Sequence, residues 1–168
     1  NTDGDTNTTS TSANVTGGFS ISTLPTYSGS TTFGHGLSVA PDLVIMKPTN
    51  GVDVWLVGAT LVGWTYGTVM NTDAVKSLNT VYWNNTAPDA TVVTLGTTGN
   101  SYTKVIYCMH SIEGYSKFGV YEGNNNADGT FIYTGFRPAW IMIKGIDSVQ
   151  PWMMSDSKRS TYNVVVDD

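Results

Sequence analysis

An internal repeat constrains the fold of this chain more than any other feature. Residues Pro41–Lys47 read Pro-Asp-Leu-Val-Ile-Met-Lys, and residues Pro138–Lys144, 97 positions later, read Pro-Ala-Trp-Ile-Met-Ile-Lys. Trp55 and Trp152 keep the same spacing. Repetition at a fixed period indicates that one supersecondary unit is used twice. The fold therefore has to place an apolar strand ending in lysine, and then a tryptophan strand, at two equivalent positions.

The repeat divides the chain into three parts, which we expect to form one compact unit. Residues 1–17 are almost all Thr, Asn, Ser, Asp and Gly and are predicted to be a polar arm, because this composition buries little apolar surface alone. Residues 18–113 form a first β repeat, and residues 114–168 form a second, incomplete one. The strands expected between Thr80 and His110 have no counterpart in the second repeat.

The residue pattern predicts an all-β fold. Val, Ile, Thr and Tyr are plentiful, and 18 Gly and 6 Pro divide the chain into short segments, which is typical of an antiparallel β-sandwich or a jelly-roll-like fold. One helical turn is expected at Asp73–Leu78, and hairpin turns with positive φ are expected at Asn50-Gly51, Gly99-Asn100 and Asp128-Gly129. The expected strands are Gly18–Ser22, Leu43–Lys47, Val52–Val57, Val69–Asn71, Thr80–Trp83, Thr91–Leu95, Tyr102–His110, Lys117–Tyr121, Phe131–Tyr133, Trp140–Lys144, Trp152–Ser155 and Tyr162–Val166.

The strand at Tyr102–His110 is apolar on both of its alternating faces, so we expect other layers to cover it on both sides. Alternation along this strand and along the repeated strands gives a list of expected core residues. They are Val44, Met46, Trp55, Val105, Tyr107, Ile141, Ile143 and Trp152.

Composition excludes several classes of protein. The chain has 168 residues, a net charge of −5 and only 12 % charged residues, without a basic patch, so we expect no nucleic-acid partner. No apolar run is long enough for a membrane span, which needs about 18 residues. The single cysteine, Cys108, excludes an intramolecular disulfide framework and a multi-cysteine zinc site.

Five motifs stand out along the chain: Gly17–Ile21, Gly34–Leu37 with Val39–Pro41, Tyr82–Pro88, Glu113–Gly119 and Tyr133–Lys144. Together they resemble a domain found in tail-associated and adhesin-like proteins of environmental, often marine, tailed bacteriophages. The resemblance runs from about Thr2 to the C-terminus, and it implies a β-rich module on the virion surface. That family has no established catalytic residues, so the resemblance supplies none for this chain.

The residues that could carry chemistry do not form a catalytic pattern. His35 lies between two glycines without an evident partner, and His110 and Ser111, as neighbours in a strand, point to opposite faces. Cys108 is expected to be a buried, inert thiol. We therefore expect no enzymatic activity, no cofactor and no metal on these three residues. Asp3, Asp5 and Asn7 are weak calcium candidates, since the loop lacks the glycine and the bidentate Glu of a calcium site.

Aromatic residues near turns are the candidates for contact with a host surface glycan. Tyr27, Trp64 and Trp83 are expected to be more exposed than the tryptophans of the repeated strands, and flat aromatic rings can stack on sugars. Three asparagines, Asn7, Asn14 and Asn84, begin glycosylation sequons, which matter only if the source organism glycosylates secreted proteins.

Incomplete repetition also predicts assembly. The missing strands leave the second repeat with an open sheet edge, which invites strand addition from another chain. The expected assembly strands include Thr8, Thr11 and Val15 of the arm and the terminal apolar run Val164, Val165 and Val166. Plain truncation of the second repeat is an equally supported explanation.

Three functions follow as hypotheses. The first is a non-enzymatic virion structural or tail-adhesin module on the tail, which forms homo-oligomers or joins other virion subunits and contacts a host glycan. The second is a secreted, self-assembling extracellular fibre subunit. The third, a glycan-degrading enzyme, is the least supported, since the chain has only two glutamates, Glu113 and Glu122.

Overall fold

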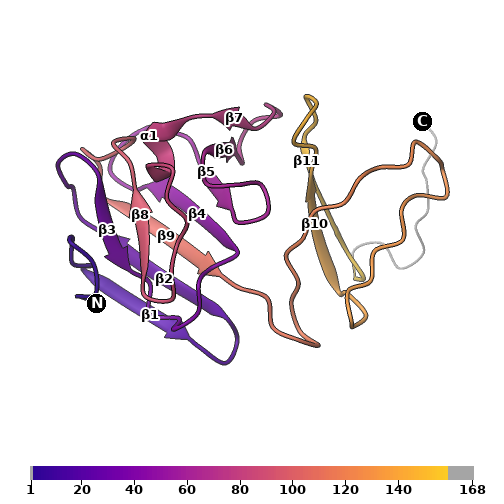
Figure 1. The fold of residues 1–168 in the computed structure, drawn as a ribbon, viewed down its shortest axis with the longest axis horizontal. Helices are drawn as coiled ribbons and strands as arrows, with labels where there is room; N and C mark the ends of the chain where they lie inside the picture. The colour runs from indigo at the N-terminus through magenta and orange to yellow at the C-terminus, as the bar shows by residue number, and fades with distance from the viewer. Residues whose placement is uncertain (1, 159–168) are drawn as a thin grey trace.

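The structure, a computed structural model, describes residues 2–158 and is an antiparallel β fold, as the sequence predicts. Its main sheet has seven strands in the order β1-β2-β9-β4-β5-β6-β7 (Figure 1). Every pairing in this sheet is antiparallel. The strands are β1 (Ser10–Asn14), β2 (Phe19–Leu24), β4 (Leu43–Pro48), β5 (Leu56–Ala59), β6 (Tyr66–Val69), β7 (Ser77–Leu78) and β9 (Lys104–Met109).

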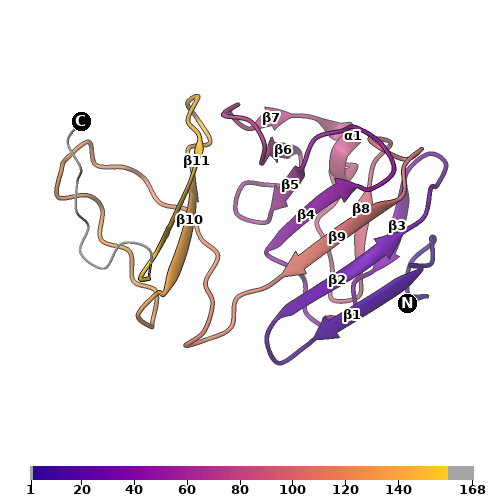
Figure 2. The ribbon, with the colours of Figure 1, turned by 180° about the vertical axis from the view of Figure 1, so that it is seen from behind.

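A second, two-stranded layer covers one face of the main sheet. It consists of β3 (Thr31–Gly34) and β8 (Val92–Leu95), which lie across β2 and β9 in both ribbon views (Figures 1 and 2). The space between the layers is the main core. Its fully buried members come from both layers: Leu24, Phe33, Leu37, Val44, Met46, Leu56, Trp64, Trp83, Val93, Leu95, Ile106 and Cys108.

The one helical turn is not where the sequence predicts it. Residues Thr80–Trp83, expected to be a strand, form α1, and the expected turn at Asp73–Leu78 instead contains β7. Asn79 caps α1 by accepting a hydrogen bond from the Val81 N–H at 3.1 Å, and Asn84 ends it in a left-handed conformation, φ 50°. These flanking asparagines outweigh the strand preference of the Thr-Val-Tyr-Trp run.

A separate hairpin of β10 (Trp140–Lys144) and β11 (Trp152–Asp156) stands beside the sandwich, as both ribbon views show (Figures 1 and 2). It is reached by a long connection in which the expected strands Lys117–Tyr121 and Phe131–Tyr133 are absent. Trp152 and Phe118 pack on a second cluster, which lies on the other face of the main sheet around Leu43, Ile45 and Val57.

Several core predictions need correction. Val44 and Met46 are buried, but on β9 the buried set is Lys104, Ile106 and Cys108, continued by His110 just after the strand, whereas Val105 and Tyr107 are only half-buried. Trp55, Ile143 and Trp152 are also half-buried, and Ile141 is 42 % exposed. Of the three expected turns, only the one at Gly99 has positive φ, 68°.

The polar arm contributes β1 to the edge of the main sheet. β1 pairs with β2 along its whole length, and the Thr6 N–H donates to the Thr32 carbonyl of β3 at 3.0 Å. The arm, expected to supply an assembly strand, therefore has its β1 segment paired within its own chain. The Thr-rich segment instead finds its backbone partner at the nearest open edge, β2. The terminal run Val164–Val166, like the expected strand Tyr162–Val166, lies outside the described residues.

None of the helices that the structure describes is long and apolar enough to cross a membrane.

Candidate functional site

The two histidines are structural groups of the sandwich. His35 is fully buried: its Nδ1 accepts the Leu37 N–H at 3.2 Å, so Nε2 carries the proton and donates to the Asp89 carbonyl at 3.2 Å. Burial lowers the pKa of His35, since desolvation disfavours the charged ring. The Nδ1–H of His110 donates to the Ser111 carbonyl at 3.0 Å, and its Nε2 is buried without a described partner. Within the described residues, neither ring is hydrogen-bonded to a Ser, Thr or Cys side chain.

Cys108 is buried on the inner face of β9. Desolvation raises the pKa of its thiol to about 12, so the thiolate that a nucleophile or metal ligand needs is not populated near neutral pH. Within residues 2–158, no group of three His, Cys, Asp or Glu side chains is arranged to hold a metal ion.

Of the weak calcium candidates Asp3, Asp5 and Asn7, Asp5 has its carboxylate engaged in the fold. The Asp5 carboxylate accepts the Thr32 hydroxyl at 2.8 Å, which ties the arm to β3. A second loop that is rich in side-chain oxygens runs from Asn124 to Asp128, and there Asn124 and Asn126 accept backbone N–H groups two residues ahead. These oxygens stabilise turns of their own loops.

Burial overturns two of the three predicted glycan-contact residues. Trp64 and Trp83 lie in the core, with their rings edge to face at 5.2 Å, and the Trp64 indole donates to the Thr60 hydroxyl at 3.2 Å. Their place near turns suggested exposure, but the turns fold the rings inward. Tyr27 is half-buried and its hydroxyl donates to the Gly96 carbonyl at 2.9 Å. The sequon residues Asn7, Asn14 and Asn84 are all exposed.

Lys104, which sequence reasoning missed, is the most perturbed lysine of the fold. It is 1 % exposed, at the start of β9, where Nζ donates to the Tyr102 carbonyl at 2.6 Å and lies 4.5 Å from the centre of the Tyr27 ring. Burial lowers its pKa to about 8, and burial likewise raises the pKa of Tyr27 to about 12. No described carboxylate pairs with Lys104, so the ring and the carbonyl are its counterparts. The signal was present in the sequence, as a lysine within an apolar strand.

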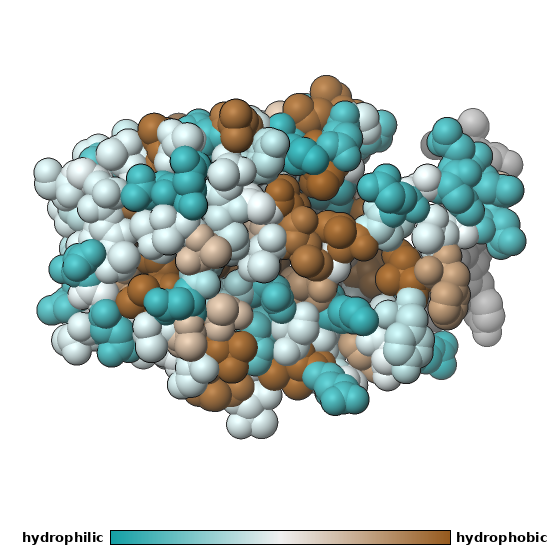
Figure 3. All heavy atoms as spheres, viewed as in Figure 1, coloured by the Kyte–Doolittle hydropathy of each residue, from teal (hydrophilic) through white to brown (hydrophobic). Residues whose placement is uncertain are grey.

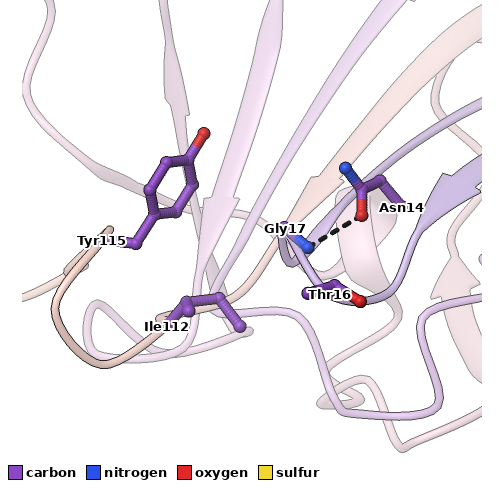
Figure 4. Close-up of a pocket in the computed structure, with 5 residues that line it drawn as sticks. All are labelled: Asn14, Thr16, Gly17, Ile112 and Tyr115. Carbon is purple, nitrogen blue, oxygen red and sulfur yellow. Dashed lines mark hydrogen bonds between the residues drawn. The ribbon is translucent and has the colours of Figure 1, made fainter.

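A shallow hollow of about 510 Å³ lies where the β1–β2 turn meets the start of the second repeat. Figure 4 shows Tyr115 and Ile112 on one side and Asn14, Thr16 and Gly17 on the other. The Asn14 side-chain oxygen accepts the Gly17 N–H at 2.9 Å, which holds the turn in place. Tyr115 is 69 % exposed, so its ring is accessible to a ligand. An aromatic ring beside amide and hydroxyl groups is the kind of surface on which a sugar can stack.

The strongest candidate site is the exposed apolar surface of residues 114–158, which were predicted to belong to a second repeat. Figure 3 shows hydrophobic residues gathered on the side of the molecule that carries β10 and β11. Exposed apolar surface marks interaction sites, so this concentration of exposed apolar residues is a candidate one. The large apolar and aromatic residues of this part that are more than half exposed are Tyr115, Val120, Phe131, Tyr133, Trp140, Val149, Met153 and Met154.

Specific contacts hold this surface in position against the sandwich. The Trp152 indole donates to the Val69 carbonyl at 2.9 Å, and Lys144 donates to the Asp73 carbonyl, also at 2.9 Å. At the hairpin tip, Lys76 and Asp147 form an ion pair at 2.6 Å. The hairpin is thus fixed by its tip and by one tryptophan, while its strands stay largely uncovered.

Comparison with known families places the whole chain in one of them. Residues 1–168 match the family described as a domain of unknown function, DUF7483. The chain belongs to the DUF7483 family. No curated protein and no solved structure matches this DUF7483 chain.

Proposed function

We propose that this DUF7483 chain is a non-catalytic structural and adhesion module on the tail of a bacteriophage particle, where it joins copies of itself or other virion subunits. The observation that carries the proposal is the exposed apolar surface of the second repeat. Phe131 is 86 % exposed, Tyr133 72 % and Met153 66 %. Surface of this kind gains free energy when a partner removes it from water, at about 25 cal/mol per Å² of apolar area.

The motif resemblance gives the proposal its setting. Two of the resembling motifs, Glu113–Gly119 and Tyr133–Lys144, contribute residues to this same surface, including Tyr115, Tyr133 and Trp140. A module that presents apolar strands on a rigid sandwich is suited to subunit contacts. The buried thiol and the neutral His35 ring are suited to holding the sandwich together.

Immunogold electron microscopy tests the location. Antibodies raised against the purified chain are expected to label the tails of particles from the source culture, and antibody pre-adsorbed with the chain is the control. Label confined to filaments without particles would refute the tail location and favour an extracellular fibre. Release of sugar from a surface polysaccharide, lost on Glu113→Gln, would refute the non-catalytic role.

A second role, contact with a host surface glycan, is favoured by the hollow beside Tyr115. Its ring is open to solvent, and the amide of Asn14 lies across the hollow (Figure 4). We expect Tyr115→Ala to abolish retention of the chain on host-cell polysaccharide. Tyr133→Ala is the matched control, since Tyr133 is similarly exposed but lies outside the hollow. Equal retention of both variants would exclude this hollow as the glycan site.

A further inference from the structure

The hairpin β10–β11 reproduces the hairpin β4–β5 of the main sheet. The four pairs from Leu43↔Ala59 to Met46↔Leu56 reappear, 97 residues later, as the pairs from Trp140↔Asp156 to Ile143↔Met153. The closing bond of each hairpin is also the same: the Thr60 N–H donates to the Asp42 carbonyl, and the Ser157 N–H donates to the Ala139 carbonyl, both at 2.9 Å.

Even the lysine contact inside each hairpin is the same in the two copies. Lys47 Nζ donates to the Asp53 carbonyl at 2.7 Å, and Lys144 Nζ, 97 residues later, donates to the Gln150 carbonyl. The two hairpins therefore share strand register, closing bond and lysine bridge. What surrounds β4 in the main sheet is a template for what β10 can bind.

The two hairpins differ in what lies beside their first strand. β4 pairs on its second edge with β9 along six residues, from Leu43↔Met109 to Pro48↔Lys104. Within residues 2–158, β10 pairs with β11 alone. The difference appears in burial: Leu43 and Val44 are buried, whereas their counterparts Trp140 and Ile141 are 52 % and 42 % exposed. The second edge of β10 thus carries a backbone ladder without a described partner strand.

We propose that β10 of a second copy of this chain occupies that edge and forms a continuous antiparallel sheet, β11–β10–β10′–β11′, across a twofold axis. This inference rests on the proposed structural function and specifies the strand through which copies of the chain would join. A twofold, isologous contact requires a strand that complements itself. The described strands β1, β3, β7, β8, β10 and β11 each have one edge without a described partner strand. Among them β10 has the longest apolar run, Trp140 to Ile143, which makes both of its faces apolar, whereas β1 is polar. Edge-to-edge pairing of this kind is β-augmentation.

Pairing about Met142 matches the side chains of the two copies. Ile141 then lies opposite Ile143 of the second copy, and Trp140 opposite its Lys144, where a cation can face an aromatic ring. The two Lys144 residues lie four positions apart along the pair, about 13 Å at about 3.3 Å per residue. That separation exceeds the screening length of about 8 Å at physiological salt, so the only charge on the strand does not oppose the contact.

Cysteine cross-linking tests the register. Directly opposed antiparallel residues have Cα atoms about 4.5–5.5 Å apart, within the range of about 4.4–6.8 Å that a disulfide spans. Met142→Cys, at the axis, is expected to give at least a tenfold higher yield of cross-linked dimer under mild oxidation than the parent chain. Ile141→Cys and Ile143→Cys are expected to cross-link with each other when mixed, and far less when alone. Ser155→Cys is the matched control, because the two β11 strands are about 14 Å apart, three strand spacings of about 4.8 Å.

Each outcome decides between this contact and its alternatives. A monomer at 100 μM by light scattering, without cross-linking of the Met142→Cys variant, would overturn the contact and leave the tail location standing if the immunogold label is present. Equal cross-linking of the Met142→Cys and Ser155→Cys variants would also overturn it. Dimerisation that appears only after deletion of residues 159–168 would show that the chain's own C-terminal segment, and not a second copy, covers the edge. Cross-linking as expected, without immunogold label on tails, would support the contact and refute the location.

Discussion

Replacement of Lys104 by methionine is expected to stabilise the sandwich at neutral pH, with a benefit that shrinks as the pH rises. The lysine is 1 % exposed and has no described carboxylate partner, so its charge is held by one carbonyl and the Tyr27 ring. Exchange of a buried charge for an apolar side chain of similar volume is often stabilising, by about 1–4 kcal/mol. Loss of the bond to Tyr102 and of the ring contact offsets part of that gain, so we expect a net gain of about 1–2 kcal/mol at pH 7.

The sign of the pH dependence follows from linkage. The pKa of Lys104 is about 8 in the folded chain, against the ordinary lysine value of 10.5 in the unfolded chain. Between these two pH values the unfolded chain therefore binds more protons than the folded one. The free energy of unfolding of the parent chain therefore rises with pH through this window. For Lys104 alone, the free energy of unfolding rises by about 2 kcal/mol between pH 7 and pH 9.5, at 1.36 kcal/mol per pKa unit.

Two other buried groups change the stability in the opposite direction as the pH rises, and their effects cancel when the variant is compared with the parent chain. The raised pKa values of Cys108 and Tyr27, both about 12, mean that the folded chain keeps these protons after the unfolded chain has lost them. They lower stability above about pH 9 and pH 10 respectively. Because Lys104→Met retains Cys108 and Tyr27, their contributions cancel in the difference between parent and variant, apart from changes in Tyr27 caused by loss of its neighbour.

Guanidinium unfolding, followed by tryptophan fluorescence at pH 7.0 and 9.5, measures this difference. The stability gap between Lys104→Met and the parent chain is expected to change by about 2 kcal/mol in favour of the parent chain as the pH rises. Lys117→Met, which removes an exposed lysine, is the control and should show a gap that does not depend on pH. A Lys104→Met gap that stays constant between the two pH values would refute the argument that the Lys104 charge is buried at neutral pH.

Three further predictions concern the core and the hairpin. His35 has a lowered pKa, so its stabilising contribution is present above about pH 6.5 and is lost as the pH falls through the folded pKa; His35→Asn should weaken the loss of thermal stability seen between pH 7.5 and pH 5. Trp152→Ala should cost about 2 kcal/mol through lost packing and the lost bond to Val69, and hydrogen exchange should show faster opening of β10 while β9 stays protected. Gly58→Ala should cost about 1–3 kcal/mol in denaturant unfolding, because a Cβ there would lie 2.6 Å from the rings of Trp64 and Trp83; unchanged stability would mean that both rings can move aside.

The repeated strands were the part of the fold that the sequence predicts best. Leu43–Lys47 and Trp140–Lys144 are strands within one residue of the expected bounds, because each is a dense apolar run that begins after a proline and ends at a lysine. Competition between weak local signals explains why the helix was predicted in the wrong place. The residues Thr80–Trp83 favour a strand, but the capping asparagines on either side make them a helical turn. Such short-range competition is hard to resolve from propensity alone.

The candidate site was harder to predict than the fold. Trp64 and Trp83 were expected at the surface because they lie near turns, yet the sandwich closes over them. Tyr115 was noticed only within the motif Glu113–Gly119 of the family resemblance, although its ring is among the most exposed of the described residues. Exposure depends on which layer lies over a residue, and alternation along one strand cannot supply that information.

The strand β9 shows why an apolar pattern on both faces carries structural information. Its inner set, with Ile106 and Cys108, lies under β3 and β8, and Tyr107 and Met109 on its outer face join the cluster that Trp152 and Phe118 cover. Each apolar face of β9 therefore has a layer over it. β10 carries the same kind of pattern, but Trp140 and Ile141 remain exposed, one on each face of the hairpin. If apolar character on both faces reflects cover on both faces, as it does for β9, then the surface of β10 is matched to a partner that residues 2–158 do not supply.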